Sequence, residues 1–179
     1  FLAPAAKPPD DGLFFRCLRS SMHARVHFAK KEHDMKVSIA SDHAGFDEKQ
    51  LLIPYLQELG YEVIDRGPES ADRVDYPDYA ALVAKDIEDD EAERGVLICG
   101  TGIGMSLAAN KCKGIRAANV TMPELAALCR QHNDANVICI SGRFVSDEDN
   151  KKIVKTFLET EFEGGRHEGR VNKISALEA

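Results

Sequence analysis

The hydrophobic and polar positions predict two kinds of segment that alternate from residue 35 onward. Short runs rich in β-branched residues are typical of buried strands, and longer runs with an apolar stripe are typical of helices packed on a sheet. Strands are predicted over Lys36–Ala40, Tyr61–Asp65, Gly95–Cys99, Ile115–Val120 and Val137–Ser141. Helices are predicted over Phe46–Leu59, Pro77–Asp90, Ile103–Lys111, Pro123–Gln131 and Ser146–Phe162, with a further short helix near the C-terminus. This alternation favours an α/β fold, a Rossmann-like three-layer α/β/α sandwich with a five-stranded parallel sheet.

Polar clusters follow three of the predicted strands. Ser41–Gly45 follows the first, Gly100–Gly104 the third and Ser141–Arg143 the fifth. In open α/β sheets, ligands bind beyond the ends of the strands, where loops run into helix N-termini. We therefore expect these clusters to meet at one ligand site.

The first 34 residues differ from the rest, because prolines break their start, basic residues accumulate and no clean apolar period is present. We predict an N-terminal extension over 1–34 and one domain over 35–179. A basic leader is compatible with an organellar transit peptide, although several acidic residues break that pattern. Because the first residue is Phe1, an over-extended reading frame with its natural start at Met35 is the other interpretation.

Composition limits the classes of protein to consider. The 179 residues suffice for one domain, and 44% hydrophobic content suffices for one sizeable core. A net charge of −7 argues against nucleic acid as the partner, since its phosphates would be repelled. Five cysteines without C-x-x-C spacing point to a reducing compartment, the cytoplasm. No apolar stretch approaches the roughly 20 residues that span a bilayer.

The most informative stretch brings Cys99 from an apolar strand onto a glycine-rich turn with the pattern G-x-G-x-G. The dinucleotide fingerprint would need glycine where Met105 stands, and the phosphate loop of nucleotide hydrolases would need a lysine that is absent. Backbone N–H groups at a helix start stabilise anions and favour the thiolate of a neighbouring cysteine. A tight turn that requires positive φ is the alternative interpretation.

Two further clusters carry charged or titratable groups. His132, within Arg130–Asp134, is a candidate general acid or base, although the dipole at a helix C-terminus also favours histidine. Arg166 and Arg170 lie four residues apart, so in a helix they share one face and suit a phosphate, or else belong to a solvated turn.

No metal site is predicted, because the histidines lack the close spacing of a preorganised site. The three histidines considered are His43, His132 and His167. Of the cysteines, Cys112, Cys129 and Cys139 are interpreted as small buried hydrophobes, which is the usual role of a free cysteine.

Six motifs, taken together and in order, closely resemble ribose-5-phosphate isomerase type B. They are Ser41-Asp42-His43-Ala44-Gly45, Asp75-Tyr76-Pro77, Cys99-Gly100-Thr101-Gly102-Ile103-Gly104, Ala109-Asn110-Lys111 with Gly114-Ile115-Arg116-Ala117, Arg130-Gln131-His132-Asn133-Asp134, and Gly164-Gly165-Arg166-His167. The resemblance runs from Met35 to the C-terminus, and residues 1–34 have no counterpart in it.

The resemblance implies interconversion of ribose 5-phosphate and ribulose 5-phosphate through a cis-enediolate, without a metal or organic cofactor. Cys99 matches the general base and His132 the acid that opens the sugar ring. The backbone amides of Gly100, Thr101, Gly102, Ile103 and Gly104 would stabilise the enediolate oxygen, with the Thr101 hydroxyl as a further donor. Methionine at 105 places the chain in the branch with a cysteine base, since another branch has glutamate there.

The resemblance also implies how the substrate is held. Asp42 and Tyr76 would position the sugar hydroxyls, and Asn133 would contact the substrate. The phosphate would be gathered by His43, Arg143, Arg166 and Arg170. The site would be completed across the interface of a homodimer, which could assemble further into a tetramer.

Three other functions stay open. An isomerase of a phosphorylated hexose, such as allose 6-phosphate or galactose 6-phosphate, is the nearest, because relatives share the scaffold. A sugar-phosphate-binding module without catalysis would have no need for both Cys99 and His132. A cysteine hydrolase would need a third group that orients the histidine, and no local pattern supplies one.

Overall fold

A computed structural model of the chain describes residues 35–178 and contains one parallel sheet of five strands in the order β2-β1-β3-β5-β4. The strands are β1 (Lys36–Ser41), β2 (Glu62–Asp65), β3 (Arg94–Cys99), β4 (Ala117–Asn119) and β5 (Val137–Ser141). The helices are α1 (Phe46–Leu59), α2 (Tyr76–Glu88), α3 (Ile103–Ala109), α4 (Pro123–Asn133), α5 (Asp147–Glu159) and α6 (Glu168–Ser175), with a 3₁₀ turn η1 (Gly165–His167) before α6. The predicted fold class is confirmed. The expectations for residues 1–34 lie outside the described residues.

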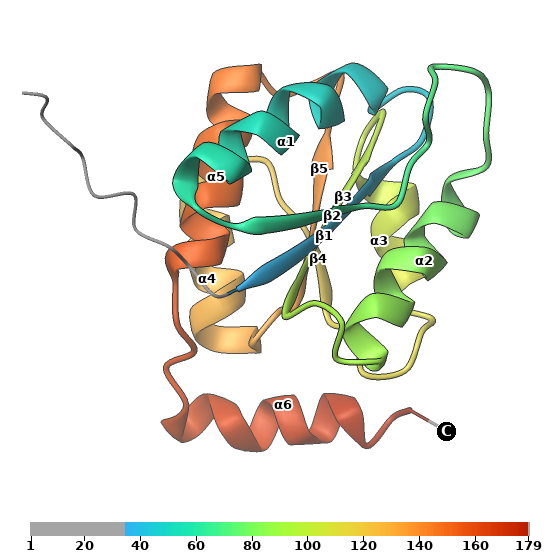
Figure 1. The fold of residues 1–179 in the computed structure, drawn as a ribbon. Helices are drawn as coiled ribbons and strands as arrows, with labels where there is room; N and C mark the ends of the chain where they lie inside the picture. Colours follow the sequence, from blue (N-terminus) through green and yellow to red (C-terminus); the bar gives the residue numbers. More distant parts are fainter. Residues whose placement is uncertain (1–34, 179) are drawn as a thin grey trace, which may run out of the picture.

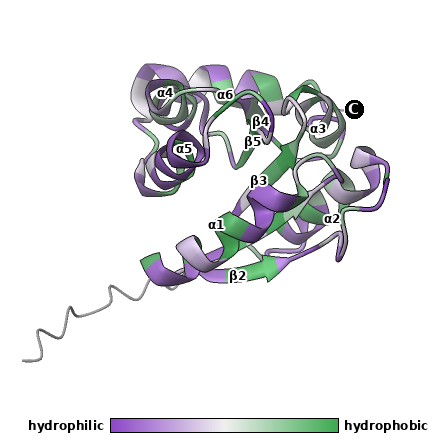
Figure 2. Cartoon of the chain, turned by 90° about the horizontal axis from the view of Figure 1, so that it is seen from above, coloured by the Kyte–Doolittle hydropathy of each residue, from purple (hydrophilic) through white to green (hydrophobic). Residues whose placement is uncertain are grey.

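The sheet is covered on both faces, which makes three layers (Figure 1). On one face, Val37, Ile39 and Ile138 pack against apolar side chains of α1, α4 and α5. On the other face, Leu97 and Val137 pack against α2 and α3. Figure 2 shows the central strands as mainly hydrophobic and the surrounding helices as mixed, as burial on both faces requires. Within residues 35–178, no helix is both long and apolar enough to cross a membrane.

The strand order fixes where the polar clusters meet. The chain leaves β1 toward β2 over one face and returns to β3 over the other, so the direction of winding changes between β1 and β3. Such a point opens a crevice beyond the strand ends. In register, Ser41 pairs with Ile98, and Cys99 pairs with Ser141. The three loops predicted to form a site therefore leave the sheet side by side.

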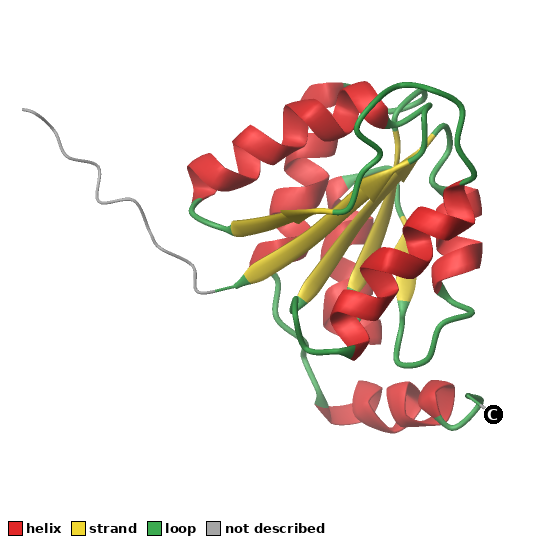
Figure 3. Cartoon of the chain, turned by 45° about the vertical axis from the view of Figure 1, so that its right-hand side comes forward, coloured by secondary structure: helices red, strands yellow, loops and turns green. Residues whose placement is uncertain are grey.

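Several element boundaries differ from the sequence prediction by one to three residues; the fifth helix, for example, ends at Glu159 and not at Phe162. The fourth helix continues to Asn133, two residues beyond the predicted end, and Asp134 then turns the chain with a φ of 46°. β4 holds only three of the six predicted residues, because it is the edge strand and pairs only with β5 along Ala117–Asn119. The C-terminal α6 lies apart from the two helical layers, beyond the edge at which the strands begin (Figure 3).

Candidate active site

Cys99 is the last residue of β3 and its side chain is 4% exposed. Its Sγ accepts a hydrogen bond of 3.1 Å from the backbone N–H of Gly102, immediately before α3. Gly102 has a φ of +78°, and a methyl group there would collide with Oδ1 of Asn119 and lie 3.1 Å from the backbone of Ile140. Only glycine therefore fits this turn. The turn therefore requires positive φ, and it also brings an N–H to the thiol.

The residues around Gly102 extend this arrangement. The Thr101 side chain is exposed, and its Oγ1 accepts a 3.2 Å hydrogen bond from the N–H of Ile103. The hydroxyl proton of Thr101 stays available for a ligand, because the bond uses only a lone pair. Two of the five amides expected to stabilise an oxyanion are thus already engaged, Gly102 with the thiol and Ile103 with Thr101.

The loop after β1 is held against β3. The N–H of Asp42 donates to the carbonyl of Ile98 at 3.0 Å, and Asp42 Oδ1 accepts from the N–H groups of Ala44 and Gly45 at 2.8 and 3.0 Å. The aspartate is 7% exposed. This carboxylate therefore shapes its own loop before any ligand arrives.

His43 and Tyr76 connect this loop with α2. Nδ1 of His43 lies 3.3 Å from the carbonyl oxygen of Val74, just before the helix. Tyr76 is the first residue of α2 and is 39% exposed. A methyl group at Gly104 would lie 2.9 Å from Cζ of the Tyr76 ring, so the ring covers the start of α3 and requires glycine there.

The loop after β5 completes this side of the site. Ser141 Oγ donates to the carbonyl of Gly100 at 2.8 Å and accepts from the N–H of Arg143 at 3.2 Å. A methyl group at Gly100 would lie 3.4 Å from Cδ of Arg143. The arginine stem therefore lies along the Cys99 loop and brings one positive charge to it.

His132 and Asn133 lie at the other end of the sheet. They end α4 only a few residues before Val137, the first residue of β5, whereas Cys99 pairs with the last residue of β5. Five residues of strand span about 13 Å at roughly 3.3 Å per residue. Within one chain, His132 is therefore well beyond hydrogen-bonding reach of Cys99.

Arg166 and Arg170 belong to this second end. Arg166 lies in η1 and Arg170 in α6, and both are exposed. The predicted site residues thus form two groups. The thiol group contains Asp42, His43, Tyr76, Cys99, Gly100, Thr101, Gly102, Ile103, Gly104 and Arg143, and the imidazole group contains His132, Asn133, Arg166 and Arg170.

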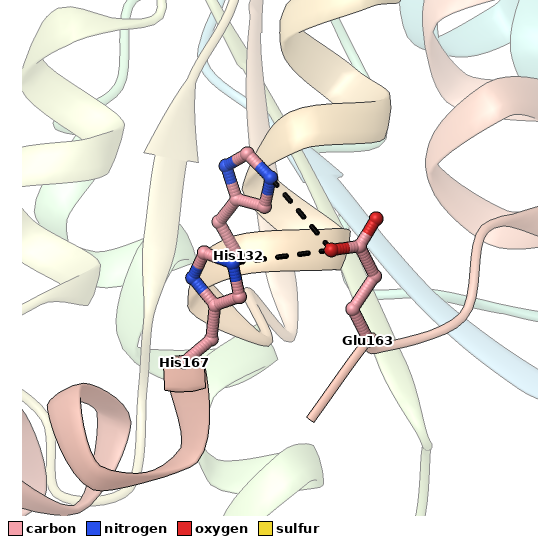
Figure 4. Close-up of side chains that lie close together, drawn as sticks. All are labelled: His132, Glu163 and His167. Atoms are coloured by element: carbon pink, nitrogen blue, oxygen red, sulfur yellow. Dashed lines mark ion pairs between the residues drawn. The ribbon is translucent and has the colours of Figure 1, made fainter. Parts of the chain in front are cut away.

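The rings of His132 and His167 are stacked, with centroids 4.3 Å apart and planes within 3° (Figure 4). Nε2 of each ring lies 3.9 Å from Oε2 of Glu163. Arg166 Nε donates to Nε2 of His167 at 3.2 Å. Burial lowers the pKa of His167, and the positive charges of His132, Arg166 and Arg170 lower it further. These causes favour the neutral form of His167, and the carboxylate of Glu163 opposes them.

Glu163 was not among the predicted site residues, and His167 was considered only as a metal ligand. Glu163 and His167 are four residues apart, a spacing that would place them on one face of a helix. His132, however, lies 35 residues before His167 along the chain. Only the fold brings them together: the N–H of Glu163 donates to the carbonyl of Gln131 at 3.1 Å. The resulting group of two imidazoles and a carboxylate contains metal-ligating atoms, which the spacing argument did not anticipate.

The remaining described cysteines are Cys112, Cys129 and Cys139. Burial raises the pKa of Cys129 to about 11 and that of Cys139 well above its ordinary value. Both thiols are buried, as predicted. Cys112 is only partly buried, because it lies in the turn after α3 rather than in a strand or helix core, so the prediction was wrong in that respect.

Comparison with known proteins supplies the family. The sequence model described as ribose/galactose isomerase matches residues 37–174, which include both groups of site residues. The chain belongs to the ribose/galactose isomerase family. Its predicted resemblance to this family is confirmed.

Individual relatives agree with this assignment. The chain is 53% identical over 143 residues to a probable ribose-5-phosphate isomerase B of Mycoplasma pneumoniae, covering 79% of this chain and 94% of the relative. It is 48% identical over 143 residues to ribose-5-phosphate isomerase B of Escherichia coli, covering 80% and 96%.

Solved structures of family members have the same fold. The structure of a ribose 5-phosphate isomerase from Thermotoga maritima matches with a TM-score of 0.79 and 50% identity, covering 81% of this chain and all of that one. A ribose-5-phosphate isomerase B from Mycoplasma genitalium with bound ribulose-5-phosphate matches with a TM-score of 0.79 and 46% identity, covering 82% and 98%.

Proposed function

We propose that this isomerase-family chain interconverts ribose 5-phosphate and ribulose 5-phosphate, and that two chains build each active site. The observation that carries the proposal is the buried thiol of Cys99 with a backbone N–H donating to its sulfur at 3.1 Å. Such an N–H favours negative charge on the sulfur, which a base requires. The names of the similar proteins supply the substrate.

In the proposed reaction, the Cys99 thiolate takes the proton from C2 of the open-chain aldose. The electrons of that C–H bond form the C1=C2 double bond of the enediolate, and negative charge moves to the O1 oxygen. Amides at the start of α3 and the Thr101 hydroxyl stabilise this oxygen, a role in which one donor contributes about 3 kcal/mol. The thiol then returns the proton to C1 as the C2 carbonyl forms.

The imidazole group has the complementary task. His132 opens the furanose ring and moves protons between the substrate oxygens. Arg166 and Arg170 hold the phosphate together with His43 and Arg143, since guanidinium groups bind phosphate oxygens with several donors. Asp42, Tyr76 and Asn133 contact the sugar hydroxyls.

The separation of the two groups within one chain supports a shared site. A second copy of the chain has to bring its His132 to the first copy's Cys99, and two-fold symmetry then produces two identical sites. Exposed apolar side chains beside the Cys99 loop support contact there: Ile103 is 53% exposed and Leu107, one helical turn later, is 63% exposed.

The test has two parts. First, turnover of ribose 5-phosphate is measured with the full chain in EDTA, with allose 6-phosphate and galactose 6-phosphate in parallel. Second, the inactive variants Cys99→Ala and His132→Asn are mixed and allowed to exchange subunits. Random exchange makes half of the dimers mixed, with one of two sites intact, so about a quarter of the original activity returns.

Each result decides a different part of the proposal. Pentose turnover with recovery on mixing supports both parts, and turnover without recovery contradicts the shared site. Turnover of a hexose phosphate alone assigns the sister activity. Binding of ribose 5-phosphate without any turnover would make the chain a binding module.

A further inference from the structure

We propose that His132, Glu163 and His167 form a binding site for a divalent transition-metal ion, and that Zn²⁺ suits their donors best. Nε2 of each histidine lies 3.9 Å from Oε2 of Glu163, and the three ligand atoms lie within 4.8 Å of one another. Two imidazoles and one carboxylate are the protein ligands of open zinc sites, which keep a further position for water or another ligand.

The separations are close to those that an ion requires. Because no two of the three atoms are more than 4.8 Å apart, a point equidistant from them lies at most about 2.5 Å from each, whereas zinc bonds to nitrogen and oxygen measure about 2.0–2.2 Å. An inward shift of a few tenths of an ångström brings all three atoms into bonding range. The hydrogen bond from the N–H of Glu163 to Gln131 ties the carboxylate's segment to the helix that carries His132.

Ring orientation is the larger adjustment. Because the two imidazole planes are within 3° of parallel, the Nε2 lone pairs run side by side and each ring has to tilt toward Glu163 (Figure 4). The side chains of His132 and Glu163 are 37% and 51% exposed, so they are free to turn toward the ion. The side chain of His167 is only 6% exposed, so it has the least room to turn and His132 and Glu163 make the larger movements.

Some of the neighbouring groups favour metal binding and others oppose it. Zinc binds neutral imidazole, and the burial of His167 beside the guanidinium group of Arg166 favours the neutral ring. Arg166, however, donates to Nε2 of His167 and has to release it before the metal binds. We therefore expect a reversible site, weaker than dedicated structural zinc sites.

The metal would act on the isomerase as an inhibitor. An ion on Nε2 of His132 occupies a nitrogen that the proposed ring-opening step uses for proton transfer; this consequence, unlike binding itself, rests on the proposed function. Arg166 would leave His167 at the same time, so metal binding and phosphate binding would be coupled through this arginine.

The binding test is a calorimetric titration of Zn²⁺ into full-length Cys99→Ala protein, in which the thiol of the other group cannot contribute. The same titration is made with His167→Asn or Glu163→Gln added, and with Glu161→Gln as the control at a nearby exposed glutamate. Residues 1–34 also contain His23, His27, His33 and Cys17, so the site is measured as the difference between proteins. Circular dichroism verifies that each variant is folded.

We expect one binding event per chain to weaken on the order of tenfold or more in His167→Asn and Glu163→Gln, and to be unchanged in Glu161→Gln. Co²⁺ in place of Zn²⁺ should show visible bands that the His167→Asn protein lacks. Equal zinc affinity and stoichiometry in all four proteins would overturn the site, whether or not the chain is an isomerase. In the protein with Cys99 intact, Zn²⁺ should inhibit turnover and EDTA should restore it; tight binding without inhibition would refute the inhibitory role alone.

Discussion

The backbone N–H of Gly102 donates to Sγ of Cys99 across 3.1 Å, and this hydrogen bond links the conformation of the turn to the chemistry of the thiol. The same residue, with a φ of +78°, closes the turn that leads into α3. A change at either residue therefore tests a different property, stability at the glycine and proton transfer at the cysteine.

Removal of the thiol should abolish turnover without unfolding the protein. For Cys99→Ala we expect kcat to fall by a factor on the order of 10²–10⁴, the usual contribution of a general base. The measurement is steady-state turnover of ribose 5-phosphate together with thermal unfolding. Cys112→Ala is the matched control, because its thiol is partly buried outside both groups. Near-normal turnover by Cys99→Ala would contradict the proposed mechanism.

Substitution of Gly102 should affect stability as well as activity. In Gly102→Ala, the added methyl would be forced against Oδ1 of Asn119 and the Ile140 backbone at a positive φ, so we expect a loss on the order of 2 kcal/mol in the free energy of unfolding. Urea denaturation measures it. Gly114→Ala separates the cost of the positive φ from the cost of the steric contact, because Gly114 also has positive φ (+73°) but nothing lies within 4 Å of an added methyl. Equal losses in both variants would show that the steric contact contributes nothing.

Glu48 should make stability depend on pH. This residue of α1 is 5% exposed, and burial, together with the neighbouring carboxylate of Asp147, raises its pKa from 4.5 to about 7. Between these values the unfolded chain releases the proton and the folded chain keeps it. The contribution of Glu48 to stability is therefore largest at low pH and falls as the pH rises from about 4.5 to 7.

The variant Glu48→Gln should flatten this dependence. The difference in unfolding free energy between pH 5 and pH 8 should shrink by on the order of 2 kcal/mol relative to the original protein. Urea denaturation at both pH values checks it, with Glu62→Gln as the control at a glutamate whose side chain is 63% exposed. An unchanged difference in Glu48→Gln would exclude the raised pKa.

Loss of Arg166 should weaken substrate binding more than the chemical step. In Arg166→Gln we expect KM for ribose 5-phosphate to rise about tenfold or more, because a hydrogen-bonded charge pair with phosphate is lost, and kcat to change less. Lys173→Gln, on the exposed part of α6, removes an equal charge without facing His167. If both variants raise KM equally, Arg166 acts on the substrate only through long-range electrostatic attraction and not through a direct contact with the phosphate.

Most helices and strands could be predicted from the sequence, because the spacing of apolar residues and the residues that start helices are patterns within one short segment of chain. Both ends of α1 and of β5 were predicted to the residue, and Pro123 does begin α4. The extent of β4 depends on its edge position in the sheet, which no local pattern encodes.

The site was predictable only in part, for a related reason. The thiol group follows strand ends, and parallel topology alone places those ends together. The stacking of His132 on His167 depends on how the segment after α5 returns to the end of α4, a contact between residues 35 positions apart. The distance between the two groups also depends on the fold, because α4 ends beside the start of β5 whereas Cys99 lies beside its last residue. Motifs that belong to one predicted site therefore lie at opposite ends of the sheet.

That distance makes the activity depend on concentration. Under the proposed function, a single chain carries the thiol group of one site and the imidazole group of another, so it contains no complete active site. Dilution below the dissociation constant of the pair would then switch off catalysis by mass action while every chain stays folded. Specific activity would rise with protein concentration until all chains are paired. Below that concentration, the number of complete active sites in a cell would increase more than linearly with the number of chains.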